Sequence, residues 1–224
     1  MILILTSLIL SKIMKKRHQS AKSEIDFDKE RANYALYKNE LLNNDFSFLK
    51  KWMNEKTIDA FTSASIPQTM GSKIKNLISD GLKNAALSAV GVKLNYIDTD
   101  AFWVLSGNNL HFFTTDTDGE LEEHLIFDVF RIEKATLQYS GLLKTQIGFY
   151  SKLTEEYLPK VHVITFDIDG QQLPLEIHDR VIYHVDPTDV WSVKKQLQIR
   201  TKHLVVGEGF LEELKSRFPH LISQ

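Results

Sequence analysis

Short apolar segments separated by turn residues fill the chain between residues 96 and 178. Phe102–Leu105 and Leu110–Phe113 flank a polar turn, and residues 163–177 repeat this arrangement around Asp169-Gly170. Alternating apolar runs joined by Asn, Asp and Gly predict antiparallel hairpins, because these residues accept the positive φ of tight turns. Further strands are expected in residues 120–138 and 142–150, so the predicted total is six or seven strands. The spacing is typical of an antiparallel β-barrel or sandwich.

Two details of this region carry further expectations. Residues 120–138 are expected to hold two strands that meet near Asp128, since Phe130 and Ile132 alternate with polar residues. Pro174 interrupts an otherwise regular run and predicts a sheet edge, because proline has no N–H for the ladder.

The first third of the chain has helical spacing instead. Apolar residues predict one helix from Asp26 to Asn43 and a second that starts at the N-cap Asp45 and extends to Phe61. A third helical pattern covers residues 70–90. We therefore expect residues 23–95 to form a helical region in front of the strands.

Two amphipathic helices are expected after the last strand. The first covers 188–199 with Thr188 as N-cap, and the second runs from Phe210 to Phe218 after a tight turn at Gly207-Glu208-Gly209. The predicted class is thus α+β: N-terminal helices followed by a six- or seven-stranded antiparallel β-barrel or sandwich closed by a C-terminal helix. The predicted division is 1–22, 23–95 and 96–224.

An apolar segment followed by basic residues marks the N-terminus. Met1–Leu10 is mostly apolar, and Lys15, Lys16, Arg17 and His18 follow it. A secretory signal peptide has the opposite order, and about 14 helical residues reach only ~21 Å of a ~30 Å hydrocarbon core. We expect residues 1–18 to act as a short membrane anchor or an interfacial helix, with the rest of the chain in the cytoplasm. The third interpretation is an ordinary helix packed on the domain.

The hairpins and the closing helix resemble a pleckstrin-homology-like barrel of the bacterial or GRAM type. The residues that carry the resemblance are the hairpins at 101–113 and 163–177 and the helix at 209–218, within a match over about 97–220. Members of such families bind phosphoinositides, peptides or other proteins. The resemblance therefore implies a binding module and leaves its ligand open.

Residue types exclude several chemistries. The chain has no cysteine, which rules out thiol catalysis, disulfides and Cys-ligated metals. His111, His124 and His162 lie in predicted strands without metal-ligand spacing, and the acidic turns at Asp116 and Asp167 lack the later ligands of a calcium loop. We predict no catalytic, cofactor-binding or metal-ligating residue.

The remaining candidate site is a basic segment. Residues 191–203 contain five basic or potentially basic side chains and no acidic one: Lys194, Lys195, Arg200, Lys202 and His203. Such a run is typical of a surface that meets lipid phosphates, although it also fits a solvated helix face.

The net charge of −2 argues against nucleic acid as the main partner. We expect a non-enzymatic binding or scaffold module at the cytoplasmic membrane face, with anionic lipid or a protein as partner and no cofactor. The alternative is a small-ligand-binding barrel with an apolar cavity lined by Phe102, Trp103, Phe112 and Phe166, or an unrecognised hydrolase.

Overall fold

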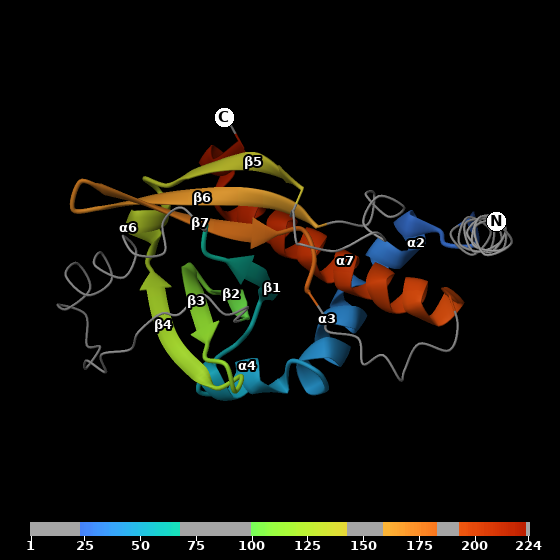
Figure 1. Ribbon diagram of the computed structural model, residues 1–224. Helices are drawn as coiled ribbons and strands as arrows, with labels where there is room; N and C mark the ends of the chain where they lie inside the picture. The colour runs from blue at the N-terminus through green and yellow to red at the C-terminus, as the bar shows by residue number, and fades with distance from the viewer. Residues whose placement is uncertain (1–22, 68–99, 143–158, 183–192, 223–224) are drawn as a thin grey trace, which may run out of the picture.

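The chain folds into an α+β structure in which one antiparallel sheet packs against a long C-terminal helix (Figure 1). The computed structural model describes residues 23–67, 100–142, 159–182 and 193–222. The predicted segments 1–22, 70–90 and 143–150 and the cap Thr188 lie outside these residues. The seven strands are β1 (Ala60–Ser65), β2 (Ala101–Ser106), β3 (Asn109–Thr115), β4 (Leu121–Phe127), β5 (Thr136–Leu142), β6 (Lys160–Ile168) and β7 (Gln171–His178).

The sheet is open, with the strand order β4-β3-β2-β1-β7-β6-β5. The two halves meet where β1 pairs with β7 over only two residue pairs, Ala64 with Ile177 and Ser65 with Glu176. At this junction the sheet bends, so that β5–β7 cross the top of Figure 1 while β1–β4 run below them. Instead of a hairpin, the short helix α6 (Val129–Ile132) connects β4 to β5. The expected α+β class and C-terminal helix are confirmed, but the described strands do not close into a barrel.

The inner face of the bent sheet holds the larger core. Trp103 lies between Phe112 and Phe166, with ring centroids 4.8 and 6.2 Å away, and its indole N–H donates to the Glu176 carbonyl at 3.0 Å. Helix α7 (Val193–Arg217) fills the opening with Phe210 and Leu214, both fully buried. Burial of these aromatic side chains contributes several kcal/mol to the stability of the fold. The same side chains pack together in the interior of the bent sheet.

A second core covers part of the outer face. There α3 (Tyr34–Asn43) and α4 (Ser47–Trp52) pack against β1, β2 and β3. Phe102 belongs to this side, with its ring 5.4 Å from that of Phe48. Because Phe102 and Trp103 point to opposite faces, the four aromatic residues of the alternative interpretation do not line one shared cavity.

One central strand lies where a helix was predicted. The chain leaves α4 at Trp52, and Asn54 and Glu55 take positive φ values of 49° and 60° that a helix does not allow. Ala60–Ser65 then pairs with β2 and β7. The predicted second helix, which was expected to extend to Phe61, therefore ends at Trp52, and Ala60 and Phe61 belong to β1 instead. Asp45 is not its N-cap, since Phe46 occupies that position. The sheet consequently draws on both predicted ranges, 23–95 and 96–224.

The two helices predicted after the sheet are one, α7, which ends in the 3₁₀ turn η5 (Pro219–Ile222). Gly207 and Gly209 lie inside the helix and do not form the predicted tight turn. A Cβ at Gly207 would lie 2.3 Å from the Arg180 Cα, and one at Gly209 would lie 2.2 Å from the Tyr34 ring. The glycines are therefore explained by the close approach of α7 to its neighbours.

The two predicted hairpins are confirmed. Ser106 pairs with Asn109 across the first turn, and Asp169 and Gly170 have φ values of 53° and 81° in the second. Pro174 pairs with Thr165 of β6 at a point where no described strand pairs with the other side of β7. The missing N–H is tolerated there, although β7 is not an edge strand.

The segment 120–138 differs from its prediction in one part. β4 and β5 form, but Phe130 and Ile132 lie in α6 between them. Asp128 starts this helical turn by accepting the Arg131 backbone N–H at 3.0 Å. The hydrogen bond to the Asp128 side chain favours a helical turn here, although the alternation of apolar and polar residues predicted a strand.

Candidate functional site

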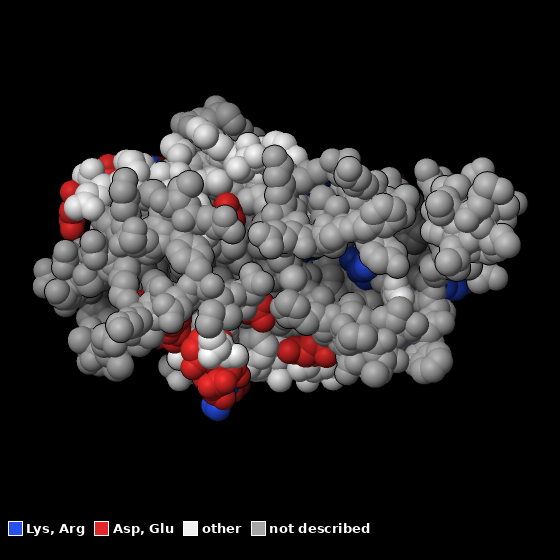
Figure 2. All heavy atoms as spheres, viewed as in Figure 1, with Lys and Arg blue, Asp and Glu red and all other residues white. Residues whose placement is uncertain are grey.

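The predicted basic segment forms the N-terminal half of α7, which extends beyond the sheet toward α2 (Phe27–Ala32) in Figure 1. Lys194, Lys195 and Arg200 are exposed there, and Lys202 is half-buried. In the view of Figure 2, visible Lys and Arg atoms lie mainly toward this end, and visible Asp and Glu atoms lie mainly over the sheet. Four of the five predicted contact residues therefore have access to solvent.

His203 is the exception, because only 4% of it is exposed. Its Nδ1 lies 3.1 Å from the Val181 carbonyl oxygen, and its ring meets the Phe46 ring at 5.9 Å. Burial lowers the pKa of His203 and favours the neutral imidazole. The expectation that His203 contacts an anionic surface is therefore wrong, since the ring is part of the interior between α7 and α4.

Two acidic residues pair with two of the lysines: Glu24, which lies before α2, and Glu40, which lies in α3. Lys194 Nζ lies 2.8 Å from the Glu24 carboxylate, and Lys202 pairs with Glu40 while lying 5.5 Å from the Tyr37 ring centroid. The hydrogen bond and the charge of Glu24 raise the pKa of Lys194. Neither carboxylate could be identified from the sequence, because 170 and 162 residues separate the partners and no local pattern indicates the pairing.

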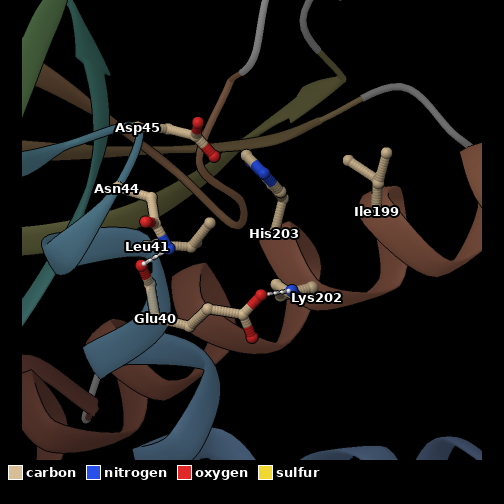
Figure 3. Close-up of a pocket in the computed structure, with 7 residues that line it drawn as sticks. All are labelled: Glu40, Leu41, Asn44, Asp45, Ile199, Lys202 and His203. Carbon is tan, nitrogen blue, oxygen red and sulfur yellow. Dashed lines mark hydrogen bonds and ion pairs between the residues drawn. The ribbon is translucent and has the colours of Figure 1, made fainter. Parts of the chain in front are cut away.

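A small hollow lies between α3 and α7 beside these pairs (Figure 3). It has a volume of about 80 Å³, and Figure 3 shows Lys202 and His203 facing the end of α3. Its lining consists of Glu40, Leu41, Asn44, Asp45, Ile199, Lys202 and His203. Ligand pockets of drug size usually measure ~300–1,000 Å³. The hollow fits only a few waters or a small ion, and its two carboxylates outnumber its single lysine.

Two of the three strand histidines meet on the outer face. His111 Nδ1 lies 2.8 Å from His124 Nε2, whereas His162 lies on β6 in the other half of the sheet. Burial, the His124 ring and Lys56 lower the pKa of His111 to about 4. No three His, Asp or Glu side chains converge as metal ligands within the described ranges. The pair is thus a neutral hydrogen-bonded unit under α4.

Ser65 contacts both Glu176 and His178 at the junction of β1 and β7. Its hydroxyl donates to the Glu176 carboxylate, and its Oγ lies 2.9 Å from His178 Nε2. Because the single hydroxyl hydrogen goes to Glu176, Nε2–H of His178 must donate to Ser65. A Ser–His nucleophile requires the reverse direction. His178 Nδ1 also has no orienting partner in the described part of the chain.

The acidic turns use their carboxylates on the backbone. Asp116 accepts the N–H groups of Asp118 and Glu120 at 2.9 Å, and Asp167 accepts that of Gly170 at 2.8 Å. These are Asx-type contacts that fix the turns. The interpretation as hairpin turns is therefore confirmed for both segments.

Among the described residues, no helix is both long and apolar enough to cross a membrane. Comparisons of the chain with protein-family models, with curated proteins and with solved structures find no match.

Proposed function

We propose that this chain is a non-enzymatic binding module that meets an anionic membrane surface with the N-terminal half of α7. The single observation that carries the proposal is the contact between Glu24 and Lys194, at 2.8 Å. It brings the start of the described chain beside the exposed basic residues of α7. The described chain therefore begins beside the basic half of α7, and the basic residues Lys15–Arg17 precede it in the sequence.

Covalent geometry bounds the distance between these segments. Arg17 lies seven residues before Glu24, and an extended chain spans at most ~3.6 Å per residue. Arg17 is therefore within about 25 Å of Glu24 in any conformation of the intervening chain. That distance allows Lys15–Arg17 and α7 to approach one flat surface together, and each basic residue near an anionic leaflet strengthens binding.

The seven-stranded antiparallel sheet followed by one helix supports the proposal of a pleckstrin-homology-like module. The sheet bends around a packed aromatic core, and the C-terminal half of α7 occupies its opening. A packed interior directs binding to the surface. In this proposal the sheet is the rigid support, and the part of α7 beyond it is the contact surface at the cytoplasmic face.

The proposal predicts salt-sensitive binding of the full chain to vesicles that contain phosphatidylserine, and weaker binding to phosphatidylcholine alone. The double substitution Lys194→Gln with Arg200→Gln should weaken this binding by roughly tenfold or more, since two charges near the surface are lost. Cosedimentation over a range of lipid concentrations measures the change.

A matched control removes two exposed lysines elsewhere. Lys134→Gln with Lys160→Gln makes the same charge change near α6 and at the start of β6. We expect at most a twofold effect from it. Equal weakening by both double variants would contradict the assignment to α7, and equal binding to both vesicle types would contradict the function.

A further inference from the structure

The segment that pairs with the basic end of α7 is itself acidic. Residues 23–32 contain Glu24, Asp26, Asp28 and Glu30, against only Lys29 and Arg31. Asp26 caps α2 by accepting the Lys29 backbone N–H at 3.2 Å. A segment with this charge favours contact with lysines and is repelled by an anionic surface.

No side chain of this segment is fully buried, although Ile25, Phe27 and Glu30 are partly buried and Glu30 accepts a hydrogen bond from the Tyr37 hydroxyl. No residue of the described helix α2 is buried. The ion pairs between residues 23–32 and α7 are Glu24 with Lys194, whose side chains are 56% and 64% exposed, and Arg31 with Glu208 at 2.9 Å. Exposed pairs of this kind contribute little to stability and are screened by salt. The attachment of α2 is therefore weak.

The next helix is attached in a different way. Leu41 and Leu42 of α3 are each 3% exposed and belong to the core of the outer face. Glu40 adjoins these buried residues, so its contact with Lys202 is held by packing. The chain can consequently separate from α7 up to about Asn33, between α2 and α3, without disturbing a core.

We propose that residues 23–32 form a displaceable acidic cover over the basic end of α7, and that an anionic lipid surface competes with Glu24 for Lys194. The inference rests on the proposed function. In the free protein, Glu24 neutralises Lys194. At the surface, lipid phosphates and carboxylates replace Glu24, and repulsion of the remaining acidic residues moves the acidic cover away from α7.

The test compares two charge-matched variants of the full chain on phosphatidylserine vesicles. Glu24→Gln removes the carboxylate that contacts Lys194. Asp28→Asn removes a carboxylate of the same segment, residues 23–32, that is 96% exposed and pairs within α2 with Arg31. We expect Glu24→Gln to tighten binding about fivefold and Asp28→Asn no more than twofold, because only the first frees a surface lysine.

Lys194→Gln supplies the second arm. If Glu24 acts by covering Lys194, Glu24→Gln should tighten binding no more than Asp28→Asn does in the Lys194→Gln background. Equal effects of Glu24→Gln and Asp28→Asn in the native background would overturn the acidic cover while the proposed function stands. If neither the native chain nor any variant prefers anionic vesicles, with folding verified by circular dichroism, both proposals are overturned.

Discussion

Acidification from pH 7 to pH 4 is expected to remove most of the stability of this protein. His178 and His111 are 2% and 3% exposed, and burial is the first cause that lowers the pKa of each to about 4. The charge of Asp179 partly offsets the lowering of the His178 pKa. His124 and Lys56 lower the pKa of His111 further. Burial also lowers the pKa of His124 and of His203.

The direction follows from proton uptake. An unfolded histidine titrates near pH 6.5, so between about pH 6.5 and pH 4 the unfolded chain binds more protons than the folded one. The stabilisation is complete above pH 6.5 and is lost as the pH falls toward 4. Each of the two histidines contributes about 3 kcal/mol over that range. Their sum is comparable with the ~5–15 kcal/mol that stabilises a typical domain.

Urea unfolding at several pH values between 7 and 4.5 measures this dependence. His178→Gln keeps a nitrogen donor near the Nε2 position that contacts Ser65 and cannot be protonated. We expect it to be less stable than the native chain at pH 7 but to lose less stability on acidification. His220→Gln, at an exposed position, is the control and should follow the native curve. Parallel curves for the native chain and His178→Gln would contradict the assignment.

Gly207→Ala is expected to destabilise the fold by about 3 kcal/mol, the upper part of the range for inserting a methyl group into a packed site. Within an ordinary helix the same change stabilises by about 1 kcal/mol. Here the new Cβ would lie 2.3 Å from Cα and 2.4 Å from N of Arg180. The expected sign is therefore opposite to the one that helix propensity gives.

The backbone at Arg180 has little freedom to move away. Asp179 N–H donates to the Lys160 carbonyl at 2.9 Å, and Val181 N–H donates to the His203 carbonyl at 3.1 Å. The segment is thus tied to β6 on one side and to α7 on the other. An alanine at 207 must break one of these contacts or shift α7 away from the sheet.

Gly209→Ala is the matched control in the same helix. Its Cβ would meet the Tyr34 ring, a side chain that can turn, whereas Gly207 faces backbone. We expect Gly209→Ala to cost less than Gly207→Ala in urea unfolding at pH 7. A Gly207→Ala variant as stable as the native chain would show that α7 does not approach Arg180 this closely.

Local patterns predicted the parts of the fold that depend on neighbouring residues. The hairpin turns at Gly107 and Asp169-Gly170 require positive φ, and the sequence places the suitable residues there. β1 could not be found in this way, because its partners are distant: Ala60 pairs with Leu105 and Ala64 pairs with Ile177. Its alanines and serines give no strong strand signal, and only the sheet selects the extended form.

For the candidate site, too, the sequence predicted only the features that depend on local residue types. The charge pattern identified the basic segment, and Lys194 and Arg200 are exposed on α7. Charge could not show that His203 turns inward, because this depends on the approach of Val181 and Phe46. Nor could it find Glu24 and Glu40, whose role arises from the packing of the N-terminal helices along α7.

Hydrogen exchange of the full chain with and without phosphatidylserine vesicles tests the central claim most directly, because it locates the contact. The account predicts slower backbone exchange in residues 193–202 of α7 and faster exchange in α2 when vesicles are present. The strands should be unchanged. Protection confined to the sheet, for example at the edge strand β4, with α7 and α2 unaffected, would contradict the assignment of the binding surface.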